Sequence, residues 1–450
     1  EDMNIEKNPS EYARIMTGLT GEKGEVELQG GEILKRSLSV ALKDFSSIRR
    51  IYSESIKDHM ESKSKNVNKR QLIMEEIGKD EKAPNAFQLL SPKEQEKFLN
   101  MAEKTVRAGR VKIMDSEIIP GNVAECIKLL KEGKLQNKDN QNKTLLQNLI
   151  QMHHQEFAEG LEGTEIFEET LKNIAHPDRI HQGNKGTCTV TTLEYINAKT
   201  HPSEYVRIIA DLTGKEGKVR LRNADIMARP EGVLQDDHSG RAPVDRIYQA
   251  SMMTYAENSL EYDNKTDKFY RIEEGTGEKT EVHGGLANVY YNKASNAVLS
   301  YDSKVINIYE PGYNKFVEKE IKEALSDGYY VPVSLSWGMD SDKPTRKGEH
   351  KLSIEKIDNN YVYLRNPHGD TDRGSTGDSK TNEPVRECVY EGDFKSSGGH
   401  IKMTKEEFYS RLTGYHMPRP SRRTSFSPAW FQSLIGHHMS LPSRRTIENG

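Results

Sequence analysis

QGNKGTC, residues 182–188, is the stretch on which the interpretation of this 450-residue chain depends. Its two glycines permit tight backbone turns, and the following TVTTLEYINAKT, residues 189–200, has apolar side chains at helical spacing. We therefore expect a helix that begins at Cys188. A thiol at a helix N-terminus is favoured as the thiolate, which makes Cys188 a candidate nucleophile. The amide of Gln182 could share with the Cys188 backbone N–H the stabilisation of an oxyanion.

Two segments further along the chain supply a base and a group to orient it. His350 lies in GEHKLSIEKI and Asn366 lies in VYLRNPHG, and both segments have the alternation and β-branched content of strands. A histidine at the start of one strand and an asparagine at the end of the next can meet in space. The imidazole would then take the thiol proton while the asparagine carbonyl sets its tautomer, as in catalytic triads.

These motifs resemble those of papain-like cysteine peptidases, and of the calpain branch in particular. QGNKGTC has the form Q-G-x-x-G-x-C, and the order DGYYVPVSLSW, then His350, then LRNPHG is similar to a calpain catalytic core. GGHIKMTKEEFYSRLT resembles the segment that closes such a core, a short strand followed by a phenylalanine-bearing helix. The resemblance covers about residues 176–416. It implies an α+β fold with a helical lobe and an antiparallel β lobe, and a Cys188, His350 and Asn366 triad with Gln182 in the oxyanion hole.

The sequence departs from the family pattern close to the expected reacting groups. Threonines flank the nucleophile, where calpains have aspartate before it and papain-like enzymes usually have tryptophan after it. Lys351 follows the histidine where a small residue is usual, and His368 stands where an aromatic usually shields the His–Asn pair. That second histidine could compete or stack, and Trp337 is a candidate for the aromatic cover. The departures suggest an atypical substrate cleft or a slow enzyme.

Composition and charge narrow the classes of partner. Hydrophobic residues make up 34% of the chain, so it can form two or three domains with a real core. Charged residues make up 30% but nearly cancel, to a formal net charge of −4, which argues against nucleic acid and anionic membranes as partners. We therefore expect a protein or peptide substrate. No apolar run approaches the length of a membrane span.

The cysteines indicate the compartment. The chain has three cysteines, Cys126, Cys188 and Cys388, which is an odd number, and their spacing is not that of metal ligands. We therefore expect reduced thiols in a reducing, cytoplasmic environment. The chain begins with Glu1 rather than methionine. A secreted effector whose N-terminal segment is missing therefore stays an open alternative.

An internal repeat occupies the start of the chain and part of the expected core. NPSEYARIMTGLTGEKGEVELQGGEILKR, residues 8–36, aligns without gaps to HPSEYVRIIADLTGKEGKVRLRNADIMAR, residues 201–229, with 14 identities in 29 positions. The similarity resumes at RIYSES, residues 50–55, against RIYQAS, residues 246–251. Such similarity predicts that the fold uses the same unit twice.

The first copy is predicted to be incomplete. Counterparts of Gln182 and Cys188 would lie before residue 1, and nothing after residue 66 matches the histidine and asparagine segments. Residues 1–66 are therefore interpreted as a partial, degenerate copy of the helical lobe. We expect residues 8–66 to have the same local fold as residues 201–264.

The remaining segments complete the predicted domain organisation. Residues 67–175 are interpreted as a polar, mostly helical region, in which Ser91 and Glu94 have capping-box spacing. Residues 176–416 form the expected catalytic core, helical up to about residue 264. The basic Pro/Ser-rich tail, residues 417–450, contains PSRRT twice and is read either as a docking site or as a solvated segment.

The second lobe is predicted from strand-like segments after about residue 300. KVINIYE, YYVPVSLSW, HKLSIEKI, NYVYLRN and GGHIKMT are expected strands, and KFVEKEIKEALSDG, residues 315–328, is an expected amphipathic helix. A substrate cleft is then expected between the two lobes. Calcium, which calpains use to bring their lobes into register, stays an open cofactor, with candidate acidic loops at residues 263–267, 340–342 and 368–372.

Three functions fit these motifs. The first is a cysteine endopeptidase with a Cys-His-Asn triad. The second is another acyl transfer on the same fold, such as deamidation or transglutamination, because a thiol ester can be resolved by water or by an amine. The third is a non-catalytic, peptidase-like binding protein. The sequence does not separate the first two.

Overall fold

The computed structural model describes several stretches of the chain. The described residues are 25–27, 33–35, 68–106, 111–113, 116–118, 121–257, 259–273, 275–337, 349–369 and 399–419. The chain divides into two compact units, residues 1–72 with 106–121 and residues 73–105 with 122–450. The second unit contains all four predicted site residues. The described chain is a mixed α+β structure whose sheets are antiparallel, in agreement with the predicted fold class.

The described strands of the first unit form two short hairpins, β1 (Glu25–Glu27) with β2 (Ile33–Lys35) and β3 (Val111–Ile113) with β4 (Ser116–Ile118). In β1–β2, Glu25 pairs with Lys35. The second repeat copy has the hairpin β5 (Lys218–Arg220) and β6 (Ile226–Ala228), in which Lys218 pairs with Ala228. In the alignment of the two copies, Glu25 corresponds to Lys218 and Lys35 to Ala228, so the two hairpins have the same register. The rest of residues 8–66 lies outside the described residues.

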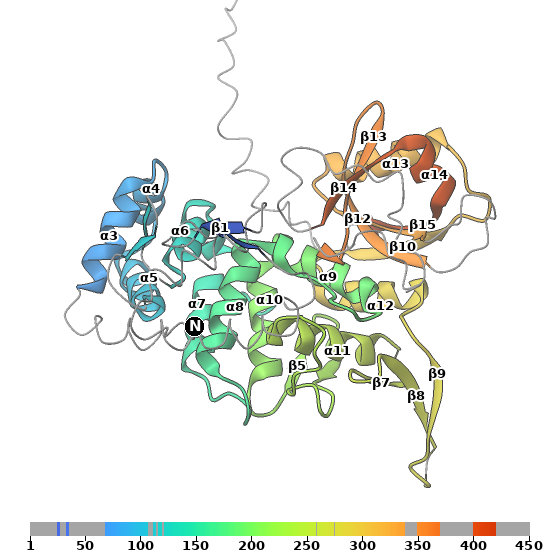
Figure 1. Cartoon of the computed structure of the whole chain (residues 1–450), viewed down its shortest axis with the longest axis horizontal. Helices are drawn as coiled ribbons and strands as arrows, with labels where there is room; N and C mark the ends of the chain where they lie inside the picture. Colours follow the sequence, from blue (N-terminus) through green and yellow to red (C-terminus); the bar gives the residue numbers. More distant parts are fainter. Residues whose placement is uncertain are drawn as a thin grey trace, which may run out of the picture. The chain divides into compact units, whose positions relative to one another are not determined.

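Helices dominate the chain before residue 300 (Figure 1). They are α3 (Lys69–Lys79), α4 (Ala83–Gln88), α5 (Pro92–Thr105), α6 (Val123–Lys131), η2 (Lys134–Gln136), α7 (Leu145–His154), α8 (Gly163–Ala175), η3 (Pro177–Arg179), α9 (Cys188–Thr200), α10 (Pro202–Thr213), α11 (Pro243–Glu257) and α12 (Asn288–Val298). The prediction of a helix starting at Cys188 is confirmed. So is the helix after Ser91, whose hydroxyl lies 2.6 Å from Glu94 Oε2.

Helix α9 is the central element of this helical part. It packs against α10, α11, α12 and the strand β12 (Glu349–Ile357), and every residue from Thr189 to Ala198 is buried. A helix surrounded on all sides has no solvent face, so its residues need not follow an amphipathic pattern. The nucleophile candidate therefore begins a helix that is held rigidly by its neighbours.

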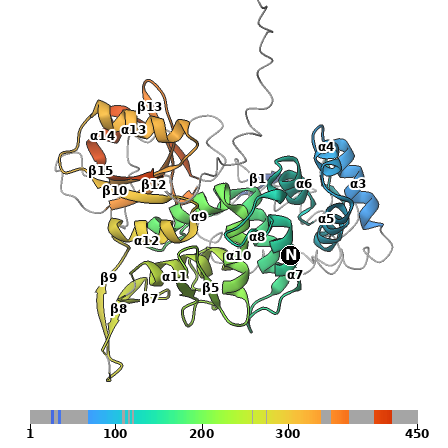
Figure 2. The ribbon, with the colours of Figure 1, turned by 180° about the vertical axis from the view of Figure 1, so that it is seen from behind.

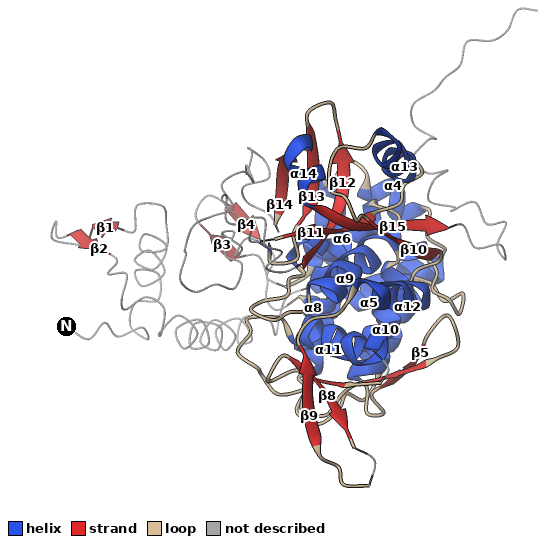
Figure 3. Ribbon diagram, turned by 90° about the vertical axis from the view of Figure 1, so that its right-hand side faces the viewer, coloured by secondary structure: helices blue, strands red, loops and turns tan. Residues whose placement is uncertain are grey.

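A six-stranded antiparallel sheet forms the part after residue 300. Its order is β10 (Asp302–Asn307), β15 (Leu412–Arg419), β11 (Val331–Ser336), β12, β13 (Tyr361–Arg365) and β14 (His400–Thr404). Helices α13 (Lys315–Ser326) and α14 (Lys405–Arg411) pack on one face, where Val317, Ile321 and Phe408 join the apolar strand residues in a core. Figures 2 and 3 show α9 and α12 on the opposite face.

That opposite face of the sheet is polar although it is buried. Ser334 and Lys351 are cross-strand partners on β11 and β12, and both are almost inaccessible to solvent. Ser353, further along β12, is also fully buried. The helical and β parts of the second unit therefore meet through hydrogen-bonding groups rather than through a purely apolar core.

The structure adds elements that local patterns did not predict. A three-stranded hairpin sheet, β7 (Glu261–Asp263), β8 (Lys268–Ile272) and β9 (Lys279–His283), extends away from the helices (Figure 1). VRLRNADI, residues 219–226, forms most of the β5–β6 hairpin, in a part of the core that was expected to be mostly helical. β15 extends to Arg419, beyond the expected core boundary at residue 416. In the part of the chain that the structure describes, no helix is long and apolar enough to span a membrane.

Candidate active site

Cys188 lies at the N-terminus of α9 and is half-buried. The backbone N–H groups of Lys351 and Thr189 lie near its sulfur. The first belongs to β12, one residue after His350, and the second to the helix N-terminus. Burial raises the pKa of the thiol, and these two N–H groups, together with the positive charge of Lys351, lower it.

His350 and Asn366 meet as predicted from the strand order. The Nε2 atom of His350 lies 2.8 Å from Asn366 Oδ1, and both side chains are buried. The backbone N–H of His368 donates to the same oxygen at 3.1 Å, which identifies that atom as an acceptor. Nε2 therefore carries the proton, and Nδ1 holds the basic lone pair.

Two rings cover the His350–Asn366 pair. The His368 ring is stacked on the His350 ring, with centroids 4.8 Å apart and an interplanar angle of 28°. The Trp337 ring lies 5.0 Å from that of His350. Trp337, the candidate for the aromatic cover, therefore lies against His350, and His368 stacks on the same ring, one of its two expected roles.

Gln182 is tied to the asparagine motif and to its own loop. Its backbone N–H donates to the Pro367 carbonyl at 2.8 Å, and its side-chain Nε2 donates to the Lys185 carbonyl at 2.5 Å. Gly183 has a φ of 58°, and a Cβ there would lie 2.1 Å from the Ser239 carbonyl oxygen. Only glycine fits this turn.

One cavity is lined by three of the four predicted site residues. It has a volume of ≈ 1130 Å³ and is bordered by the loop before α9, the segment before α12 and the strands β11 and β12. Gln182, Cys188 and His350 all line it, together with Trp337 and His368. Its volume lies just above the range of about 300–1,000 Å³ that is usual for ligand pockets.

A buried polar network supports the loop from behind. Gln249 on α11 accepts from the Thr187 hydroxyl at 2.9 Å and donates to Glu194 at 2.9 Å and to the His181 carbonyl at 3.1 Å. Burial raises the pKa of Asp245 to about 7 and that of Glu194 well above its usual value, so this neighbouring pair shares a proton. Sequence reasoning missed this network, because its members follow no motif spacing.

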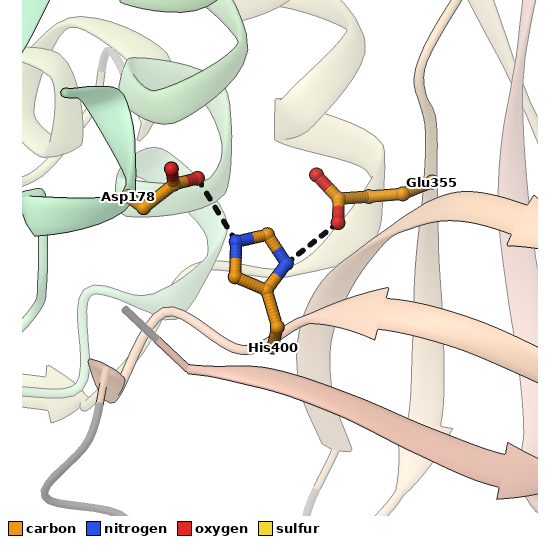
Figure 4. A group of neighbouring side chains, drawn as sticks. All are labelled: Asp178, Glu355 and His400. Atoms are coloured by element: carbon orange, nitrogen blue, oxygen red, sulfur yellow. Dashed lines mark hydrogen bonds and ion pairs between the residues drawn. The ribbon is translucent and has the colours of Figure 1, made fainter. Parts of the chain in front are cut away.

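Asp178, Glu355 and His400 form a second cluster, drawn in Figure 4, which we call the ionic cluster. His400 Nε2 lies 3.0 Å from Asp178 Oδ1, and Nδ1 lies 2.7 Å from Glu355 Oε2. Lys199 Nζ on α9 is 3.1 Å from Glu355 Oε1. The cluster therefore joins η3 and the nucleophile helix to β12 and β14.

The ionic cluster has the ligand types of a metal site but the electrostatics of an ion pair. The two carboxylates raise the pKa of His400 to about 9, against the cost of its burial. The pKa values of Asp178 and Glu355 fall to about 2 because His400 and Lys199 lie beside them. The imidazole is therefore a cation with both nitrogens engaged, and a metal ion would have to displace it and its proton.

The acidic loop at residues 263–267 has its carboxylates engaged by protein donors. Asp263 Oδ1 accepts from the Lys265 N–H at 2.8 Å, and Asp267 Oδ2 accepts from the Gly186 N–H at 2.7 Å. Asp267 thus holds the loop before Cys188 in place. The loop at 340–342 and residues 370–372 of the third candidate lie outside the described residues.

No family model and no curated protein matches this chain.

Proposed function

We propose that the chain is a papain-like cysteine endopeptidase that cleaves protein or peptide substrates. The observation that carries the proposal is that His350, which is paired with Asn366, lines the same cavity as a cysteine at a helix N-terminus. A nucleophile, a base and an orienting group with these roles are the parts that thiol-dependent acyl transfer requires. A two-lobe arrangement, helices on one side and the sheet on the other, is the fold that we assign to residues 176–416.

In the proposed mechanism the base acts through Nδ1. Asn366 accepts the Nε2–H of His350, so Nδ1 takes the proton of the Cys188 thiol. The thiolate attacks the substrate carbonyl carbon, and the imidazolium then protonates the leaving amine. Water attacks the resulting thiol ester, with His350 again accepting a proton, and the cysteine is regenerated.

The oxyanion would be held by two N–H groups at the start of α9. One is the backbone N–H of Cys188, and the other belongs to the side-chain amide of Gln182. That amide has two hydrogens, and donation of one to the Lys185 carbonyl fixes its orientation. The second hydrogen is then the oxyanion donor.

Peptide-bond cleavage in a mixture of denatured proteins tests the proposal. Wild type and Cys188→Ala are compared with and without calcium, and a thiol-directed epoxide followed by peptide mapping locates the reactive thiol. Cys126→Ser is the matched control, because Cys126 is fully buried in α6 and burial raises its pKa to about 12. We expect cleavage and Cys188 labelling in wild type and in the control. No cleavage by wild type and no labelling of Cys188 would favour the non-catalytic alternative.

A further inference from the structure

Lys351 is a buried ammonium in the wall of the active-site cavity. It is 2% exposed and lines the cavity with Cys188 and His350. Its Nζ lies 2.6 Å from Ser334 Oγ and 2.9 Å from His416 Nε2, and it also donates to Asn288 Oδ1. An ammonium has three hydrogens, and these three acceptors take all of them.

All three acceptors are uncharged. His416 must accept through Nε2, so its Nδ1–H donates to Asn292 Oδ1, at 3.1 Å, and the ring is neutral. Burial, with the charge of Lys351 added, holds the pKa of His416 well below its usual value. Within the described residues, no carboxylate forms a salt bridge with Lys351.

Besides His350, the adjacent residue on β12, three titratable groups of the described chain bear on the charge of Lys351. Tyr291 on α12 faces the ammonium with its ring, 5.6 Å from Nζ, and burial raises its pKa, which keeps it neutral. Glu349 on β12 accepts from the Asn288 side-chain N–H at 3.0 Å and so acts on Lys351 from a distance. Cys188 on α9 is the remaining group, and its charge and that of Lys351 act on each other.

A buried cation without a bound anion is unfavourable for folding, and such positions are commonly functional. Burial lowers the pKa of Lys351 to about 7, while Cys188 and Glu349 raise it. The anion that would compensate this charge most directly is the one that forms during the proposed reaction, the thiolate of Cys188.

We propose that Lys351 is a positioning residue that stabilises the Cys188 thiolate through its positive charge. The inference rests on the proposed function, since it assigns the lysine a role at the same nucleophile. The coupling is reciprocal: a charged Lys351 favours the thiolate, and the thiolate favours the protonated form of Lys351. Thiolate and ammonium are therefore expected to titrate together.

The test is the pH dependence of Cys188 alkylation by iodoacetamide in the full chain. The thiolate sulfur forms a bond to the reagent carbon and iodide leaves, so the rate reports the thiolate fraction without requiring peptidase activity. Lys351→Met removes the charge and keeps an unbranched chain. Lys356→Met, at an exposed position on the same strand, is the matched control.

We expect Lys351→Met to raise the apparent thiol pKa by about one unit, which slows alkylation at pH 6.5 by about tenfold. Lys356→Met should leave the profile unchanged. Lys351→Met should also lower the unfolding temperature, because Asn288, Ser334 and His416 lose the donor that they share. A purely structural lysine would give the same loss of thermal stability with an unchanged pH profile, so the pH profile is the decisive readout.

A second variant keeps the inference testable if Lys351→Met does not fold. Asn288→Asp keeps the shape of the side chain but places an anion on the Lys351 ammonium, which should also slow alkylation at pH 6.5. Unchanged profiles in both variants, with folded protein, would overturn the inference. Shifted profiles without peptide cleavage by wild type would leave this inference standing while the proposed function fails.

Discussion

The ionic cluster leads to a quantitative prediction about stability and pH. His400→Gln replaces the imidazolium between Asp178 and Glu355 by a neutral amide of similar reach. The pKa of His400 is about 9 in the folded chain and about 6.5 in an unfolded chain. A difference of about 2.5 units corresponds to about 3 kcal/mol. His400 is 11% and Glu355 16% exposed, but Asp178 is 34% exposed, so solvent screening of the Asp178 contact makes this figure an upper value.

The sign of the effect follows from the direction of the shift. A group whose folded-state pKa is raised stabilises the fold fully below its unfolded pKa and loses that contribution as pH rises through the folded pKa. The contribution of His400 is therefore present below about pH 6.5 and lost between about pH 6.5 and 9. The lowered pKa values of the two carboxylates act in a separate window, where stability is lost as pH falls from about 4.5 to about 2.

Chemical denaturation at pH 6 and pH 9.5 measures the effect. Other groups also titrate in this interval, so the decisive quantity is the free energy of unfolding of wild type minus that of His400→Gln. We expect this difference to be larger at pH 6 than at pH 9.5, by up to about 3 kcal/mol. His154→Gln, at an exposed histidine on α7, is the control and should show no such change. A difference that is the same at both pH values would refute the assignment of His400 as a buried cation.

The remaining predictions concern the candidate active site. Cys188→Ala should abolish peptide cleavage, and His350→Ala should lower the turnover rate nearly as much. Asn366→Ala should lower it less, because Asn366 only orients the imidazole. Turnover assays on the three variants test these expectations. Gln182→Ala should lower turnover by about a hundredfold or more, the usual effect of losing one oxyanion donor, with substrate binding little changed in steady-state kinetics. Gly183→Ala should destabilise the fold by about 1–3 kcal/mol, because φ is positive there and the new Cβ would collide with the Ser239 carbonyl oxygen. Thermal unfolding measures this loss, and a variant as stable as wild type would contradict the turn geometry.

Local patterns in the sequence determined the elements that carry the candidate triad. Apolar spacing after the glycine loop predicted a helix from Cys188, and alternation around His350 and Asn366 predicted the strands β12 and β13. These predictions succeed because spacing, residue composition and the glycine loop before the helix are properties of short segments, although α9 and most of β12 are buried on more than one face. The contact between His350 and Asn366 could be predicted because it requires only that two successive strands be neighbours in the sheet.

Only the tertiary structure decided the groups that surround the triad. His400 meets Asp178 across 222 positions of sequence, and Lys351 meets His416 across 65. β15, inserted between β10 and β11, was not predicted either, because its position in the sheet depends on strands far away in the chain. Hydrogen bonds and ion pairs of this kind depend on the order of the strands and on which face of the sheet meets the helices, and neither property leaves a periodic signal in the segments that meet.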